Sequence, residues 1–412
     1  MGKVELYPYQ KEAVQSLKRN KHFLIAGTGL GKGFISLEWA RQTGKHNVVV
    51  VTMASKRDSH DFENEGESLD SSWFSSLSSF SVLSWNGLKK WYQNNFTKID
   101  WSDYAFIFDE SHRSKAGISS AMGRAFLKIA KHTKCWTGYT ATPGDRWIDF
   151  YPYFTATDKV PNKTHFQNKF CSIQTYKGYP EIVAYRNEDL LMKWWKDIAY
   201  FPDTEIVESQ LPSETHKTIH FKKPKDYAKV IKTRLNADGE LLDTNIGLCH
   251  YLRQICATKD KLQWISDFIE GLGERCVIFY NYIDEGEKIA KTIQKVMPKD
   301  AKIWFINGKS HDIPTDETMG KRDVVLAQWT SGSASLNLQF MNYWVSFSPC
   351  YSLTVSMQGR GRIKRIGQKK PMFFYYLRCD ATIEEDIYDC LHDKKDFSEK
   401  TWIEQNLIEK GE

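Results

Sequence analysis

The sequence lacks a hydrophobic run that could cross a membrane. Its longest apolar stretches, such as Val48 to Val51, are far shorter than the roughly 18 to 20 residues of a transmembrane helix. The first ten residues, MGKVELYPYQ, also lack the apolar segment of a secretory signal peptide. We therefore expect a soluble protein with no membrane partner, located in the cytoplasm of a bacterium or of an infected host cell.

Paired cysteines are missing as well. The eight cysteines are scattered, and none form the CxxC pair of a zinc or redox motif. The nearest approach to a metal cluster is Cys249 and His250 with Cys256, which has no second pair of ligands. The pattern favours reduced, mostly buried thiols and argues against a zinc site.

A strong charge of one sign is the third absence. The 57 Lys and Arg residues against 51 Asp and Glu residues give a net charge of +6, which permits a polyanionic partner without requiring one. The hydrophobic fraction of 41% and the aromatic fraction of 14% exclude a globally disordered chain. At about 150 residues per domain, the 412 residues predict two or three domains.

Short β-rich apolar runs alternate with amphipathic stretches in two parts of the chain. This βαβ order predicts an α/β fold with parallel sheets that are covered on both faces. The runs are 22–26, 47–52, 80–84, 104–108 and 135–139 in the first part, and 276–280, 302–306, 323–327, 343–347 and 372–377 in the second. The serine-rich segment 68–85, in which apolar residues are interleaved, predicts a loop that runs into a strand.

These two series set the expected domain boundaries. We predict one α/β domain in residues 1–160 and a second in residues 246–390. The stretch between them, 161–245, is more polar and contains five prolines, which predicts an insertion and interdomain connection. Residues 391–412 are expected to form a C-terminal helical tail.

The clearest motif is a glycine-rich loop near the N-terminus. The strand-like HFLIA runs into glycines and a lysine and then into the helical pattern FISLEWARQ, which is the order that a phosphate-binding loop requires. Backbone N–H groups and the helix N-terminus hold phosphates in such a loop, and Lys32 adds a positive charge. The sequence therefore predicts an ATP site formed by Gly27, Thr28, Gly29, Leu30, Gly31, Lys32 and Gly33.

Gly33 departs from the usual pattern. A Ser or Thr normally follows the lysine, and its hydroxyl ligates Mg²⁺. Two consequences compete, because a water could replace the hydroxyl or hydrolysis could be lost. We favour the water, since Mg²⁺ normally keeps several waters.

Two carboxylates, Asp109 and Glu110, follow the apolar run 104–108. Ligands of open parallel sheets bind at this end of the strands. Asp109 is the predicted Mg²⁺ residue, and Glu110 can orient the attacking water. An Asp-Glu pair alone is more often a solvated loop, but the upstream phosphate loop favours catalysis.

A basic segment, QGRGRIKRIGQ, covers residues 358–368. Arg362 and Arg365 are three residues apart and would share one helical face, from which both could reach a phosphate as arginine fingers. A basic surface patch or a direct nucleic-acid contact is the alternative.

Taken in order, these elements resemble the motifs of superfamily 2 helicases, and specifically the Swi/Snf-type branch of double-stranded DNA translocases. The resemblance spans about residues 5 to 390, with RIGQ as its most specific part, and the compact length resembles a minimal form such as a phage encodes. The matching segments are LYPYQ at 6–10, motif I at 27–32, DESH at 109–112, motif III at 140–143, motif IV at 277–281, motif V at 332–338, motif VI at 358–371 and TIEEDIYD at 382–389.

The resemblance implies two tandem RecA-like domains with parallel sheets and an ATP cleft between them. It implies that Gln10 reads the adenine, that Gln358 faces the nucleotide, and that Lys32, Asp109, Glu110, Arg362 and Arg365 are the catalytic residues. ATP and Mg²⁺ are the implied cofactors. Motif V departs from the family at Ser333 and Ser335, where glycine is usual.

The resemblance also implies positions that grip a nucleic-acid backbone. Such contacts track phosphates and carry no sequence information, so we expect sequence-independent binding that weakens with salt. The positions are Lys56, Arg57, Ser84, Trp85, Asn86, Asn281, Trp329 and Thr330. For Trp85 and Trp329, core packing is an equal alternative to base stacking.

The leading hypothesis is a monomeric ATP-dependent helicase or translocase that moves on duplex or branched DNA, in fork or junction remodelling during replication, recombination or repair. One alternative is a helicase that tracks single-stranded DNA or RNA. The other alternative is an ATP-binding DNA clamp without turnover, because Gly33 lacks the hydroxyl that normally ligates Mg²⁺.

Overall fold

The computed structural model describes residues 4–19, 21–27, 29–144, 146–176, 179–203, 211–308, 314–335, 337–365, 367–399 and 402. The chain divides into two compact units, Met1–Glu208 and Ser209–Glu412. None of the helices in the described part of the chain is long and apolar enough to span a bilayer.

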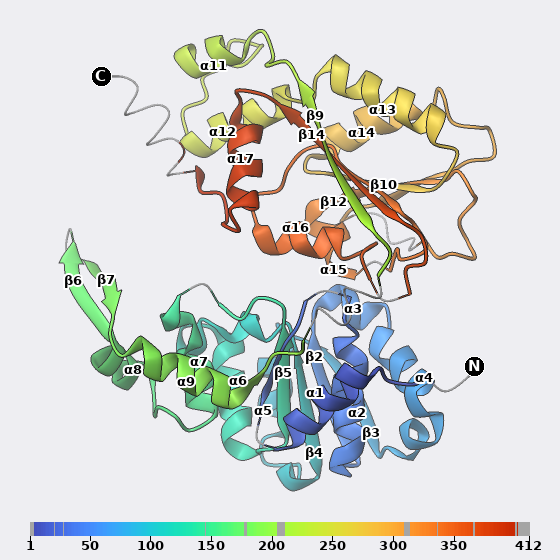
Figure 1. The fold of residues 1–412 in the computed structure, drawn as a ribbon. Coiled ribbons are helices and arrows are strands. Elements are labelled where there is room, and N and C mark those ends of the chain that lie inside the picture. Colours follow the sequence, from blue (N-terminus) through green and yellow to red (C-terminus); the bar gives the residue numbers. More distant parts are fainter. Residues whose placement is uncertain are drawn as a thin grey trace. The chain divides into compact units, whose positions relative to one another are not determined.

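The first unit is built on a six-stranded parallel sheet (Figure 1). Its strands, in spatial order, are β3 (Ser79–Ser84), β2 (Asn47–Thr52), β4 (Tyr104–Asp109), β5 (Trp136–Thr140), β1 (Phe23–Ile25) and β8 (Ala199–Tyr200). The central strands are continuous apolar runs because helices cover the sheet on both faces, and Val48 to Val51 are at most 1% exposed. All five strands predicted in this part of the chain are present.

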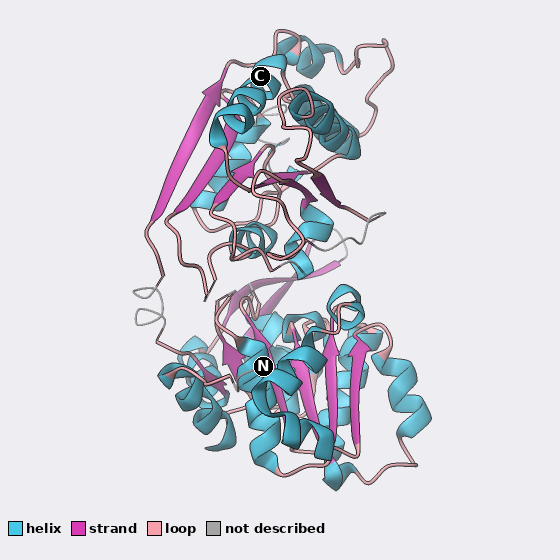
Figure 2. Ribbon diagram, turned by 90° about the vertical axis from the view of Figure 1, so that its right-hand side faces the viewer, coloured by secondary structure: helices cyan, strands magenta, loops and turns pink. Residues whose placement is uncertain are grey.

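Helices surround this sheet (Figure 2). They are α1 (Pro8–Arg19), α2 (Lys32–Thr43), α3 (Ala54–Asp58), α4 (Asp61–Ser76), α5 (Leu88–Asn95), α6 (Ala121–His132), α7 (Tyr151–Ala156), α8 (Lys163–Phe170) and α9 (Glu188–Ile198). The antiparallel pair β6 (Cys171–Tyr176) and β7 (Tyr179–Tyr185) stands apart from the main sheet. The prediction of a loop from residue 68 was wrong, because α4 continues to Ser76.

The second unit repeats the architecture with another six-stranded parallel sheet. Its strands, in spatial order, are β11 (Ile303–Ile306), β12 (Val324–Gln328), β10 (Cys276–Tyr280), β13 (Tyr343–Ser346), β14 (Met372–Cys379) and β9 (Glu214–Phe221). Its helices are α11 (Tyr227–Thr233), α12 (Asn245–Ile255), α13 (Lys259–Leu272), α14 (Ile283–Ile293), α15 (Trp329–Ser335), α16 (Leu353–Arg360) and α17 (Ile383–His392). The predicted α/β class with two parallel sheets is confirmed.

A buried ion pair ties two helices of the second unit together. Lys261 of α13 donates to both carboxylate oxygens of Glu384 at 2.7 Å, and the two side chains are 0% and 1% exposed. Cys256 and Cys379 lie beside Glu384, with potential ligand atoms within 4.8 Å of one another. The Lys261 ammonium neutralises the Glu384 carboxylate, so this cluster is balanced by an ion pair within the protein and does not need a metal ion for charge.

Candidate nucleotide-binding site

The loop between β1 and α2 has the backbone conformation of a phosphate-binding loop. Gly29 and Gly31 have φ angles of 80° and 67°, in the left-handed region that glycine adopts without steric cost. Helix α2 begins at Lys32, directly after Gly31, so its N-terminus lies at the carboxyl end of β1. Gly27, Leu30 and Gly33 belong to the same loop and helix start, while Thr28 lies outside the described residues.

Lys32 crosses this loop. Its ammonium donates hydrogen bonds to the carbonyl oxygens of Ala26 at 3.0 Å and Gly27 at 2.7 Å. These bonds place the positive charge over the loop backbone, close to the N-terminus of α2. The charge is therefore available to an anion that the loop amides bind.

Helix α1 packs its N-terminal residues against the same loop. The Tyr9 hydroxyl donates to the Leu30 carbonyl at 2.9 Å, and Gln10 Nε2 donates to the same carbonyl at 3.3 Å. A Cβ atom on Gly31 would overlap Gln10 Nε2, so position 31 requires glycine for its contact as well as its φ angle. The structure thus brings Gln10 to the phosphate loop.

Asp109 is the last residue of β4 and is 2% exposed. Its Oδ2 atom accepts hydrogen bonds from Thr52 Oγ1 at 2.5 Å and from Lys56 Nζ at 3.2 Å. Burial would lower the pKa of Lys56, but the charges of Asp109 and Glu65 outweigh burial and raise the pKa. Lys56, predicted to contact nucleic acid, thus lies within the carboxylate cluster.

Glu110 follows in the left-handed conformation, with φ of 50° and ψ of 52°. Its Oε2 atom lies 3.3 Å from His112 Nδ1, and the same ring nitrogen lies 2.9 Å from Thr140 Oγ1. Burial would raise the pKa of Glu110, but the His112 hydrogen bond and the charge of Lys32 outweigh it and lower the pKa to about 2. Glu110 is therefore ionised at neutral pH and can accept a hydrogen bond from a water.

Two further residues of this site were missed from the sequence. Tyr139 of β5 is the register partner of Asp109 and is 1% exposed. Glu65 of α4 lies against Gly33, because a Cβ atom on Gly33 would overlap Glu65 Oε2. Tyr139 is adjacent to the predicted motif III and could have been found from the parallel pairing of β4 and β5. No local signal marks Glu65.

The basic motif of the second unit is not a continuous helix. Helix α16 ends at Arg360, and the chain turns through residues 361–365. The predicted helical face for Arg362 and Arg365 was therefore wrong, because Gly359 and Gly361 weaken the helix at its end. Arg362 Nε donates to the Gln358 carbonyl at 3.1 Å.

The loop after α15, which ends motif V, and the basic motif touch each other. Arg365 donates to the side-chain oxygen of Asn337. The Leu338 N–H donates to the Arg362 carbonyl at 3.1 Å. Asn337 and Leu338 are the motif V residues that match the family, whereas the side chains of Ser333 and Ser335 lie outside the described part of the structure.

The two predicted base-stacking tryptophans lie in hydrophobic cores. Trp85 is 2% exposed and its Nε1 donates to the Asp109 carbonyl at 2.7 Å. Trp329 is 3% exposed and its Nε1 donates to the Ser348 carbonyl at 2.8 Å. Of the two alternatives left open for these residues, core packing is therefore the one that the structure favours.

The remaining predicted nucleic-acid positions fall into two groups. Asn86 and Thr330 are exposed, and Arg57 pairs with Asp58 beside it at 2.6 Å. Ser84 Oγ accepts the Gly87 N–H at 3.2 Å, and Asn281 Nδ2 donates to the carbonyl oxygen of Pro349 at 2.7 Å. The first three can meet solvent or a polyanion, while the last two hold the local backbone.

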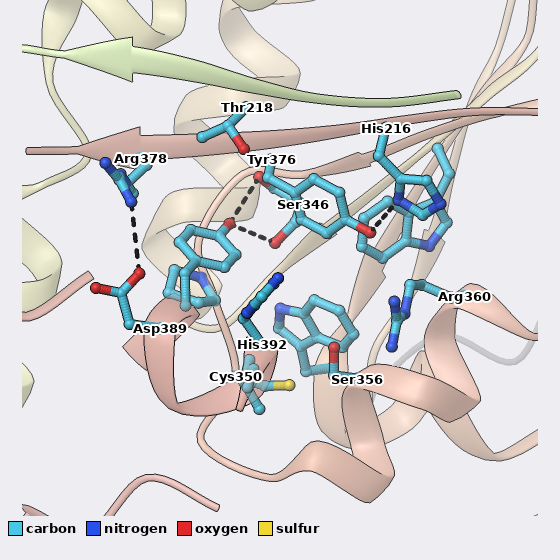
Figure 3. Close-up of a pocket in the computed structure, with 15 residues that line it drawn as sticks. His216, Thr218, Ser346, Cys350, Ser356, Arg360, Tyr376, Arg378, Asp389 and His392 are labelled. Carbon is cyan, nitrogen blue, oxygen red and sulfur yellow. Dashed lines mark hydrogen bonds and ion pairs between the residues drawn. The ribbon is translucent and has the colours of Figure 1, made fainter. Parts of the chain in front are cut away.

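Beside Trp329, the second unit contains a cavity of about 450 Å³ (Figure 3). Trp344 also lines it, and Arg360 reaches it from the end of α16. On the strand side, His216 Nδ1 lies 3.0 Å from the Tyr376 hydroxyl. Of the three arginines of the basic motif, Arg360 is the one that lines this cavity.

Comparison with known proteins gives distant similarities. No protein-family model matches the chain. YwqA of Bacillus subtilis (strain 168), named for a proposed ATP-dependent helicase/translocase activity, is 24% identical over 154 residues, which are 36% of this chain and 16% of YwqA. YqhH of the same organism, named as an uncharacterized ATP-dependent helicase, is 27% identical over 160 residues, 38% of this chain and 28% of YqhH. The matches thus span less than a third of either relative.

A solved structure shows the same fold across nearly the whole chain. It is the ATP-dependent Type ISP restriction-modification enzyme LlaBIII bound to DNA, with a TM-score of 0.55 and 13% identity over 93% of this chain and 28% of that one. At this identity the likeness concerns the fold alone. This chain therefore shares its fold, with two six-stranded parallel sheets, with part of that enzyme.

Proposed function

We propose that this protein is a DNA-dependent ATPase of the helicase and translocase type, which moves on duplex or branched DNA as a monomer. The observation that carries the proposal is the convergence of Lys32, Asp109 and Glu110 at the carboxyl edge of one parallel sheet. Phosphoryl transfer needs positioned positive charge and an oriented nucleophile more than covalent chemistry by the protein, and this set supplies both.

Each of these residues has a distinct task. The loop amides and Lys32 bind the phosphates of ATP. Glu110, ionised and held by His112, accepts a hydrogen bond from a water and orients that water toward the terminal phosphate. Gln10, which packs on the loop, is proposed to contact the adenine, and Gln358 also faces the nucleotide.

The residues present fit a Mg²⁺ ion. Asp109 offers carboxylate oxygens, which Mg²⁺ prefers, and the Lys56 ammonium 3.2 Å from Asp109 Oδ2 marks a place that accepts a cation. When bound, Mg²⁺ neutralises charge on the phosphates. Asp109 is the residue that would hold it.

Arg362 and Arg365 are proposed to stabilise charge on the transferring phosphate. ATP binding and hydrolysis would then change how the two units grip DNA, and repeated cycles would produce movement. The names of YwqA and YqhH and the DNA-bound state of LlaBIII support this proposal. The grip would include Arg57, Asn86 and Thr330, and replication, recombination or repair is the proposed setting.

ATP hydrolysis measured with duplex, forked, four-way and single-stranded DNA, and with RNA, tests the proposal. We expect duplex or forked DNA to stimulate hydrolysis, and we expect Lys32→Ala to abolish the stimulated rate. Activation by single-stranded DNA or RNA alone would favour a strand-tracking helicase instead.

A clamp without turnover is the second candidate, and Gly33 is the observation that favours it. DNA and ATP binding by a protein with no ATPase activity on any of these nucleic acids would support the clamp. Strong stimulation by duplex DNA would exclude it.

A further inference from the structure

The space that a Ser or Thr side chain would occupy at position 33 is filled by a carboxylate. Gly33 is buried, and a Cβ atom built on it would overlap Glu65 Oε2 and lie 2.9 Å from Glu65 Cδ. The Glu65 carboxylate therefore occupies the space beside Gly33 into which any side chain at this position would extend. Glu65 brings an oxygen donor next to the residue at which other phosphate loops carry the hydroxyl.

Glu65 is held there by the start of α4. Phe62, one turn earlier in the helix, is 0% exposed, and Lys56 Nζ lies 4.5 Å from the centre of its ring. The same Lys56 ammonium contacts Asp109 Oδ2 at 3.2 Å. Helix α4 is thus packed against the residue that pairs with the predicted metal-binding aspartate.

The charges of this arrangement balance. An acid in place of a neutral hydroxyl adds one negative charge beside a site that binds phosphates, which by itself would weaken nucleotide binding. Lys56 adds one positive charge in the same cluster, with its ammonium 3.2 Å from Asp109 Oδ2. The charges of Glu65 and Lys56 therefore cancel, and the net charge of the site equals that of a phosphate loop with a neutral hydroxyl.

A second observation points to a ligand among these groups. Tyr139 pairs with Asp109 across β4 and β5 and is 1% exposed. Its hydroxyl oxygen lies near Ser36 but makes no hydrogen bond of normal geometry among the described residues. A buried hydroxyl without a partner is costly, and a metal-bound water would satisfy it.

We propose that Glu65 replaces the missing hydroxyl at position 33 and, with Asp109, ligates the divalent cation that binds with the nucleotide. Lys56 supplies the compensating charge. This inference rests on the proposed ATPase function, and it replaces the expectation that a water alone fills the place of the hydroxyl. Oxygen donors from two carboxylates suit a hard divalent cation.

Mn²⁺ affinity, measured by electron paramagnetic resonance on the full chain with ADP, tests the proposal without relying on turnover. We expect Glu65→Gln to weaken Mn²⁺ binding by about tenfold or more, the scale of losing a residue that supports a metal. ADP binding in the presence of a chelator should be kept or become tighter, because a negative charge has been removed. Glu67→Gln, an equal charge change at an exposed position of the same helix, is the matched control.

A swap of the two positions gives the sharper result. Gly33→Ser combined with Glu65→Ala returns a hydroxyl to the loop and removes the carboxylate that would collide with it. We expect this double variant to bind Mn²⁺ more tightly than Glu65→Ala alone. Equal Mn²⁺ affinity in the native protein and Glu65→Gln, or a double variant no better than Glu65→Ala, overturns the proposal.

The same titrations separate this inference from the proposed function. A native chain that binds neither ADP nor ADP with Mn²⁺ contradicts the ATPase proposal itself, and the role of Glu65 falls with it. A native chain that binds both, with Glu65→Gln unchanged, contradicts only the role of Glu65.

Discussion

The indole N–H of Trp85 donates a 2.7 Å hydrogen bond to the backbone carbonyl of Asp109. This bond joins the residue after β3 to the end of β4, and it fixes the point where the chain turns from Asp109 into Glu110. Trp85 lies in a segment that resembles a nucleic-acid motif, but its hydrogen bond in this structure is to the end of β4, which carries Asp109 and Glu110. In the proposed ATPase, this residue would therefore act on the nucleotide site rather than on DNA.

The first prediction concerns this bond. Trp85→Phe keeps an aromatic ring in the core and removes the donor, so a buried carbonyl loses its partner. We expect the free energy of unfolding to fall by about 1 to 3 kcal/mol, and the ATPase rate to fall without DNA as well as with it. Urea unfolding and ATPase assays measure the two effects. A loss confined to DNA affinity, with unchanged stability, would restore the stacking interpretation.

The second prediction concerns pH. The pKa of Glu110 is lowered in the folded state to about 2, from about 4.3 in an unfolded chain. A lowered pKa contributes stability that is fully present above the unfolded pKa and is lost as the pH falls through the folded one. The difference in free energy of unfolding between the native protein and Glu110→Gln should therefore be constant from pH 7 to about pH 5. Below about pH 4.3 the native protein should lose stability relative to the variant.

Urea unfolding of both proteins at several pH values from 7 to 3.5 measures this difference. Glu67→Gln, on an exposed part of α4, is the control for the general loss of a carboxylate. A difference that stays constant down to pH 3.5 would contradict a lowered Glu110 pKa, because equal folded and unfolded pKa values leave stability independent of this group.

The strands were predictable because their signal is local. Runs such as Val48 to Val51 are apolar without interruption, and only a strand covered on both faces buries every side chain of such a run. The phosphate loop and the Asp109–Glu110 pair were predictable for a similar reason, since a few adjacent residues carry the whole pattern.

The contacts between segments were not predictable. Helix α4 was missed because serines from residue 68 onward suggest a loop, while its burial comes from Phe62 and Leu69 packing on the unit. Glu65 reaches Gly33 from 32 positions away in the sequence, and only the fold sets that distance. The tryptophans were ambiguous because burial of a large aromatic depends on its tertiary neighbours.

The third prediction separates the two roles open to Lys56. In the structure its ammonium pairs with Asp109 at 3.2 Å, and only 23% of its side chain is exposed. We expect Lys56→Met to weaken ADP binding and to lower the ATPase rate without DNA, because a positive charge beside the phosphates is lost. DNA affinity in the absence of nucleotide should stay within about twofold of the native value.

Arg57→Met is the matched control for the same segment, because the Arg57 side chain is 41% exposed and pairs with its exposed neighbour Asp58. We expect it to weaken DNA binding and to leave ADP binding intact. The opposite pattern in the two variants would assign Lys56 to DNA.

The last prediction concerns the buried pair Lys261 and Glu384 of the second unit. Glu384→Gln keeps the shape and the acceptor for the Cys379 N–H at 2.9 Å, but it leaves the Lys261 ammonium buried without a countercharge. We expect a loss of about 3 to 5 kcal/mol in the free energy of unfolding, measured by urea denaturation. Asp284→Asn breaks an exposed pair with Lys288 and should cost less than about 1 kcal/mol. Similar losses in the two variants would mean that water reaches Lys261, since only exclusion of water makes the unpaired ammonium costly.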